Sequence, residues 1–148
     1  MSRIKLVAGV VLFILGSVYL DVTLRARTAY YEGEKYVQWH NDPSKKKAYS
    51  DALYEKEKAD LDRKLAQGAL TKPEYSQRVV LEKFRRDEAI AESSLKYAYH
   101  WYKTAVELFS PPESRWVRLS REKMAQTKEL WKKELEAQKI PYEEYMLE

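Results

Sequence analysis

An unbroken apolar run near the N-terminus is the strongest pattern along this chain. Fifteen residues from Leu6 to Leu20 carry no charge, which at 1.5 Å per residue makes about 22 Å of helix. Extending the run at both ends to residues 4–24 gives about 21 residues, enough to cross a hydrocarbon core of ~30 Å. The pattern therefore predicts a transmembrane helix over residues 4–24, preceded by a basic tail over residues 1–5.

A cleaved signal peptide and a buried core helix are the alternatives for this segment. A signal peptide has the same basic start, but a cut after Ala29 would put Arg27 at the −3 position, where a small residue is needed. A buried helix needs apolar partners, and no other segment is apolar enough to surround it. The pattern favours an uncleaved signal-anchor.

The basic residues around the apolar run bear on its orientation. Arg3 and Lys5 precede the run and favour a cytoplasmic N-terminus, while Arg25, Arg27 and Lys35 follow it. A long C-terminal domain crosses a membrane largely regardless of its charge. We therefore expect a single-pass inner (cytoplasmic) membrane protein with a periplasmic C-terminal domain. The mitochondrial inner membrane is the alternative.

Long amphipathic segments and short turns predict an all-α fold, in which the single N-terminal transmembrane helix is followed by an antiparallel helical hairpin or bundle of long helices. Residues 25–41 read as an aromatic juxtamembrane helix and residues 42–148 as a helical domain. Its expected helices cover about 43–67, 72–109 and 112–138, with a short tail over 141–148. The turn signals are Asp42-Pro43 as helix start, Gly68 as helix stop, and Thr71-x-x-Glu74 and Ser110-x-x-Glu113 as capping boxes.

The third expected helix carries a heptad-like apolar seam, broken only around Asp87-Glu88. Such a seam packs against other helices, so we expect it to form a core or partner-binding face. We expect the C-terminal end of this helix to form the centre of the core. The seam residues are Phe84, Ala91, Leu95, Ala98, Tyr102, Ala105 and Phe109.

Small and aromatic residues suggest two further contact surfaces. Gly9 and Gly16 share one helix face with Ser17 beside them, which permits close packing of a second membrane helix, although Gly is common in membrane helices in any case. Twelve Tyr and four Trp suit either an interface, with partner proteins or at the membrane surface, or a core of aromatics between helices. The candidate interfacial aromatics are Tyr19, Tyr30, Tyr31, Tyr36 and Trp39.

Composition and charge narrow the possible chemistry. The net charge of +4 comes from the N-terminal tail and the lysine run at 45–47, and acids are interleaved with bases elsewhere, which argues against nucleic acid as a partner. The absence of Cys excludes disulfides and thiolate sites. His40 and His100 lack the Glu-x-x-His spacing of di-iron bundles. We expect no catalytic residue, cofactor, metal or small-molecule substrate, and we expect His100 to join an aromatic cluster.

Two short segments resemble known helical modules. The pattern Ala98-x3-Tyr102-x2-Ala105-Val106-x-Leu108-x2-Pro111 resembles the second helix and closing proline of a tetratricopeptide repeat, over about residues 98–111. Leu65-x2-Gly68-x-Leu70-Thr71-x2-Glu74-Tyr75 is similar to the turn of short helical-hairpin oligomerisation modules. Both resemblances imply a role in protein binding without an enzymatic activity.

These patterns lead to one expected function and one alternative. We expect a non-catalytic accessory, structural or assembly subunit that binds other subunits of a membrane protein complex through its transmembrane helix and helical domain. The alternative is a membrane-anchored, tetratricopeptide-like adaptor that binds a soluble protein or peptide.

Overall fold

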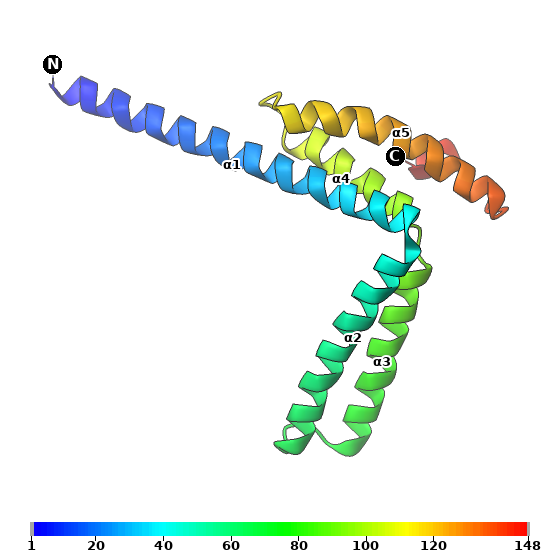
Figure 1. Ribbon diagram of the computed structural model, residues 1–148. Helices are drawn as coiled ribbons and strands as arrows, with labels where there is room; N and C mark the ends of the chain where they lie inside the picture. The colour runs from blue at the N-terminus through cyan, green and yellow to red at the C-terminus, as the bar shows by residue number, and fades with distance from the viewer. Residues whose placement is uncertain (1, 148) are drawn as a thin grey trace. The chain divides into compact units, whose positions relative to one another are not determined.

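The computed structural model describes residues 2–147, which are 86% helical and contain no strand. The elements are α1 (Ser2–Asn41), α2 (Pro43–Ala66), α3 (Lys72–Ala91), α4 (Ser94–Leu108), α5 (Arg115–Ala137) and the 3-10 turn η1 (Glu144–Leu147) (Figure 1). The all-α prediction with a long apolar N-terminal helix is confirmed. Met1, Glu148 and the side chains of Ser2 and Ile4, which belong to the predicted tails and span, lie outside the described part of the chain.

Three of the turn signals act as the sequence predicts. Asp42 caps α2 by accepting a hydrogen bond from the Ser44 amide at 3.2 Å, and Pro43 takes the first helical position, where its missing N–H costs nothing. Gly68 follows the end of α2 with φ +71°, a left-handed conformation that favours glycine. Thr71 and Glu74 form the reciprocal capping box at the start of α3, with the Thr71 amide donating to Glu74 Oε2 at 2.9 Å.

The single helix predicted over 72–109 is wrong, because the structure breaks it into α3 and α4. The backbone leaves the helical conformation at Glu92, which has φ −61° and ψ 148°. The carbonyl of Glu92 accepts a hydrogen bond from the buried Lys46 ammonium of α2, and two serines follow, whose hydroxyls compete with helical hydrogen bonds. A contact with a residue distant in sequence therefore fixes this break.

The predicted cap at Ser110 is also misplaced. Helix α5 begins at Arg115, and its N-cap is Ser114, whose hydroxyl accepts a hydrogen bond from the Val117 amide at 3.3 Å. Pro111 and Pro112 explain the delay, since proline restrains the residue before it to extended conformations. The helix start predicted at 112 therefore moves to 115.

The chain divides into two compact units. The hairpin unit (39–93) contains α2 and α3, whose antiparallel register is marked by the Tyr75 hydroxyl donating to Asp62 at 2.5 Å and by Arg86 lying 3.7 Å from Asp51. The bundle unit contains α1 as far as Gln38 together with everything from Ser94 on.

The core of the bundle unit lies where α4 packs on α5. Ala98, Tyr102 and Ala105 of α4 are fully buried, and so is Val117 of α5. The C-terminal tail docks on this pair: Leu147 joins a buried cluster whose other members are Leu95, Tyr99 and Trp131. Lys128 and Lys132 hold the tail through Glu144, at 2.9 and 3.0 Å.

Replacing Leu147 by Ala tests whether the tail is part of the fold. Leu147 is 2% exposed, so L147A should lower the free energy of unfolding by about 2–3 kcal/mol and shift tryptophan emission to longer wavelength as Trp131 becomes wet. Urea unfolding followed by fluorescence measures both effects. The half-exposed neighbour Met146 gives the control, M146A, and equal effects of the two changes would contradict the docked tail.

Candidate interaction surface

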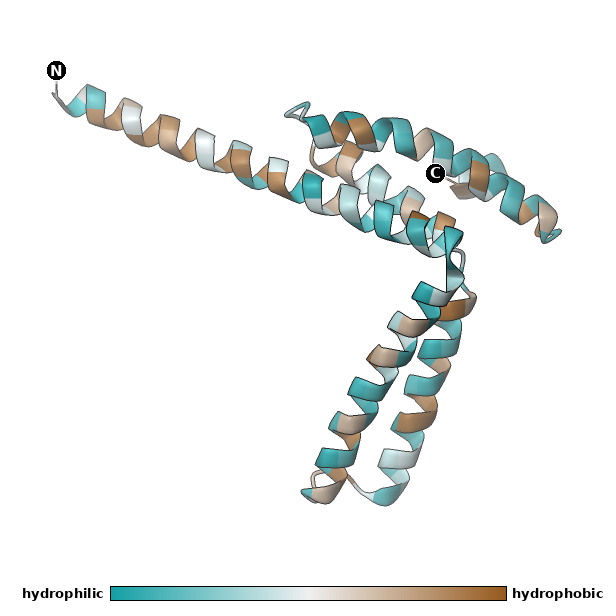
Figure 2. Ribbon diagram, in the orientation of Figure 1, coloured by the Kyte–Doolittle hydropathy of each residue, from teal (hydrophilic) through white to brown (hydrophobic). Residues whose placement is uncertain are grey.

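The first half of α1 presents a long apolar surface that nothing covers. Every side chain from Leu6 to Leu20 is exposed, and an 18-residue window of the helix has a mean hydropathy of 2.1 (Figure 2). By length and composition, α1 can cross a membrane. The sequence prediction of one N-terminal candidate span is therefore confirmed at that level.

Small residues in this half of α1 face open space. A Cβ atom built on Gly9 or Gly16 would meet nothing within 4 Å. The Ser17 hydroxyl donates to the Phe13 carbonyl at 2.9 Å, so this side chain is satisfied within its own helix. The role of Gly9, Gly16 and Ser17 in packing a second membrane helix stays a prediction.

The second half of α1 packs against α4, and Gly33 lies directly against Tyr102 of that helix. A Cβ atom on Gly33 would lie only 2.5 Å from Cε1 and 2.7 Å from Cζ of Tyr102. The Tyr102 hydroxyl donates to Glu34 Oε1 at 2.6 Å, and Lys123 of α5 lies 3.3 Å from the same oxygen. One carboxylate of α1 thus joins α4 and α5, and the ring that reaches it needs a glycine beneath it.

Gly33 is not among the residues that the sequence patterns predict as functional. The available signal was a glycine inside an otherwise helical aromatic segment, which costs about 1 kcal/mol against Ala and therefore suggests a packing reason. Its partner, Tyr102, was predicted as a core residue, but nothing local links the two positions.

An aromatic–arginine cluster, formed by Tyr30, Tyr31, Trp116, Arg27 and Arg115, joins α1 to the start of α5. The Trp116 ring centroid lies 5.5 Å from that of Tyr30 and 5.3 Å from that of Tyr31. The guanidinium of Arg27 lies 5.8 Å from the Trp116 centroid, and that of Arg115 lies 5.6 Å from it, within the range of cation–π attraction. The cluster combines exposed positive charge with amphipathic rings.

The candidate interfacial aromatics separate into two groups. Tyr36 stacks on Tyr97 of α4 with centroids 5.2 Å apart, and Tyr30 is half-buried against Trp116. Trp39 is buried in the hairpin unit, against Tyr49. Tyr36, Tyr30 and Trp39 therefore contact other helices of their own units, whereas Tyr19 and Tyr31 are exposed.

The predicted apolar seam does not form one face. Leu95, Ala98, Tyr102 and Ala105 are buried in the bundle unit, and Phe109 is half-buried there. Phe84 is 59% exposed and Ala91 is also exposed, both in the hairpin unit. The break at Glu92 separates positions that the heptad spacing joined. Four seam residues of α4 therefore lie in the core, as expected for the C-terminal part of the seam, whereas Phe109 at its end is only partly buried.

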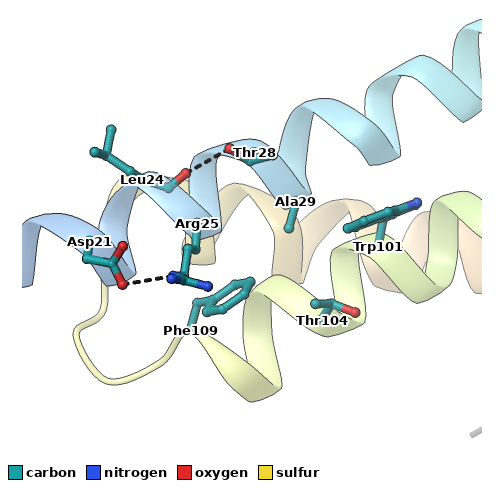
Figure 3. A pocket seen from close by; sticks show the side chains of 8 residues that line it. All are labelled: Asp21, Leu24, Arg25, Thr28, Ala29, Trp101, Thr104 and Phe109. Carbon is teal, nitrogen blue, oxygen red and sulfur yellow. Dashed lines mark hydrogen bonds and ion pairs between the residues drawn. The ribbon is translucent and has the colours of Figure 1, made fainter. Parts of the chain in front are cut away.

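A shallow groove of about 350 Å³ lies between α1 and α4 (Figure 3). Its apolar walls include Leu24, Trp101 and Phe109, while Arg25 donates to Asp21 at 2.8 Å along one side. The Thr28 hydroxyl donates to the Leu24 carbonyl at 3.1 Å. The remaining lining residues are Ala29 and Thr104. Asp21 and Arg25 thus satisfy each other, and Thr104 donates to the His100 carbonyl at 2.8 Å, so the groove offers mainly an apolar contact.

His100 belongs to an aromatic cluster, as predicted. Its ring centroid lies 5.4 Å from that of Tyr99 and 6.0 Å from that of Trp131. Burial lowers the pKa of His100, with help from the nearby Lys96 and Lys103, so the ring is neutral at pH 7. Over the described part of the chain, no three His, Asp or Glu residues gather in a way that could hold a metal ion.

No protein-family model, curated protein or solved structure matches this chain. The tetratricopeptide-like pattern over residues 98–111 therefore stays a resemblance of sequence.

Replacing Gly33 by Ala tests the close approach between α1 and α4. The new methyl group would meet the Tyr102 ring, which is fully buried and has no room to move, so G33A should destabilise the bundle unit by about 1–3 kcal/mol. Thermal unfolding followed by near-ultraviolet circular dichroism measures the change. G16A is the matched control, because its methyl group enters open space and gains helix propensity. A G33A variant as stable as G16A would show that the contact is absent.

The Tyr102–Glu34 hydrogen bond predicts a pH dependence. Burial, together with the Glu34 carboxylate, raises the pKa of Tyr102 above its ordinary value of about 10. A raised pKa means that the stability due to the neutral phenol is complete below about pH 10 and is lost as the pH rises further. Y102F should therefore flatten the alkaline fall in unfolding free energy and lower stability at pH 7 by about 1 kcal/mol.

Urea unfolding at a series of pH values compares this variant with Y31F, whose ring is half-exposed. An alkaline fall as steep in Y102F as in Y31F would contradict the assignment.

Proposed function

We propose that this protein is a non-catalytic, single-pass membrane protein that acts as an accessory, structural or assembly subunit of a larger membrane protein complex. The observation that carries the proposal is the contrast along α1. Its apolar first half is bare, whereas Ala26, Ala29 and Gly33 in its second half are buried under other helices of the bundle unit. A helix built in this way anchors a domain and leaves its membrane part available to lipid and to other spans.

The small residues of the span support a role in binding a second membrane helix. Gly9 and Gly16 lie seven residues apart and so on nearly the same face. Inside a bilayer, moving an apolar side chain from lipid to a neighbouring helix gains little free energy, because lipid tails are equally apolar. Close backbone approach at small residues therefore drives helix association. The open space above both glycines is the room that such a partner needs.

The hairpin unit supports a second contact with partner proteins. Five of its large apolar side chains are at least 45% exposed, and Val80 of α3 is the most exposed at 68%. Polar contacts such as Tyr75 to Asp62 hold its helices together, and its only fully apolar buried side chain among the described residues is Leu61. The exposed members are Tyr49, Leu53, Val80, Leu81 and Phe84.

The proposed location is the inner membrane, with a cytoplasmic N-terminus and the helical domain on the outer side. The support is the pair Arg3 and Lys5 ahead of the run, together with a domain long enough to be translocated regardless of its charge. In a mitochondrion the equivalent side would be the intermembrane space.

Co-purification of the tagged full-length chain from its own membranes in mild detergent tests the proposal. We expect an integral membrane partner at a fixed molar ratio. The double variant G9L/G16L should lose most of this partner, because two bulky side chains keep a neighbouring helix away without touching anything in the chain itself. V11L/V18L is the matched control, since Val11 and Val18 are also exposed and seven residues apart.

A monomer without a stoichiometric partner would overturn the proposal. Retention of a soluble protein or peptide, unaffected by either double variant, would instead support the membrane-anchored adaptor.

A further inference from the structure

We propose that the α4–α5 end of the bundle unit rests on the surface of an anionic phospholipid bilayer, with Leu108 and Phe109 at the boundary between acyl chains and headgroups. This inference rests on the proposal that residues 4–24 cross a membrane. It adds a second membrane contact, made by a part of the chain about 85 residues later in the sequence.

The contacts of α4 place its C-terminal end at a defined position along α1. Helix α4 runs antiparallel to α1, because Tyr97 stacks on Tyr36 and Tyr102 binds Glu34, while Phe109 lines the groove with Asp21, Leu24 and Arg25 (Figure 3). The end of α4 therefore lies level with the residues where the apolar run of α1 ends. Because α1 is one continuous helix from Ser2 to Asn41, this level is fixed relative to the span.

Apolar side chains at the end of α4 are exposed at this level. Leu108, the last residue of α4, is 71% exposed, and Phe109 next to it is only half-buried. A span of about 21 residues that includes Leu24 puts that residue near the edge of the hydrocarbon core. Leu108 and Phe109 therefore present apolar surface where a bilayer replaces water.

Aromatic and arginine side chains lie just beyond that edge. Tyr30 lies six residues after Leu24, or about 9 Å further along the helix, a distance that reaches the headgroup layer. The aromatic–arginine cluster sits at this height, and rings with a polar tip favour that layer. Across the described ion pairs, Arg27 and Arg115 have no carboxylate partner and lie instead against Trp116.

The two chain segments at this level both carry a net positive charge. Residues 21–31 hold Arg25 and Arg27 against Asp21, and residues 108–121 hold three arginines against Glu113, so the two segments carry +1 and +2. Asp21 is paired with Arg25 and Glu113 with Arg121. The excess is positive and arginine forks bind phosphate oxygens well, so the complementary surface is one of anionic phospholipid headgroups.

Spin-label depth measurements on the full-length chain in nanodiscs test the inference. The chain has no Cys, so single nitroxides can be attached at L108C, F13C and L130C, all at exposed positions. Phe13 reports the span. Leu130 lies seven residues beyond Lys123, whose partner is Glu34, and so reports a part of α5 far from the proposed bilayer.

In nanodiscs that contain phosphatidylglycerol, we expect the Leu108 label to be accessible to oxygen and shielded from an aqueous nickel chelate, as the Phe13 label is. The Leu130 label should be open to nickel. If the Leu108 label is as open to nickel as the Leu130 label while the Phe13 label is shielded, the surface contact is wrong and the span stands. If the Phe13 label is also open to nickel, the span itself is wrong.

Two changes test the part played by charge. Nanodiscs of phosphatidylcholine alone, or the double variant R27Q/R115Q, should let the bundle unit tilt together with α1, which moves the Leu108 label outward and raises its exposure to nickel. R78Q/R85Q removes two exposed arginines of the hairpin unit and should leave the Leu108 label where it is. A Leu108 depth that responds neither to the lipid nor to R27Q/R115Q would overturn the headgroup contact.

Discussion

The packing of the Tyr102 ring on the bare backbone at Gly33 is the contact on which the bundle unit depends. Only a helix without a side chain at this position lets the ring come close enough for its hydroxyl to reach Glu34, 2.6 Å away. Lys123 completes the arrangement from α5. One small residue therefore brings together three helices and a charge pair that would be costly to leave incomplete in a partly buried site.

Helix α1 therefore serves both as the proposed membrane anchor and as part of the core of the bundle unit. The buried residues Ala26 and Ala29 belong to the same unbroken helix as the bare apolar stretch. A fragment that begins at residue 42 would lack the surface on which α4 and α5 pack. The proposed span and the bundle unit thus share one continuous helix. A partner that binds the span would therefore act directly on the bundle unit.

Local signals in the sequence predicted the fold well, and distant contacts limited what the sequence could show. Thr71, Glu74 and Gly68 each act within one helical turn, so spacing alone identified them. The break at Glu92 depends on Lys46, 46 residues earlier, and no spacing rule contains that contact. Gly33 was missed for the same reason, because its partner lies on another helix. The prediction of one continuous heptad seam was wrong because Phe84 and Ala91 belong to the hairpin unit, whereas the remaining seam residues belong to the bundle unit.

The distribution of burial also changes how the aromatic content is understood. Tyr36 and Trp39 lie against Tyr97 and Tyr49, so part of the Tyr and Trp content packs between helices. The exposed Tyr31 and the half-buried Trp116 stand instead beside Arg27. In the proposed membrane arrangement, the aromatic side chains of α1 therefore have two roles: Tyr36 packs within the bundle unit, and Tyr31, which is nearer to the end of the apolar run, lies at the membrane surface.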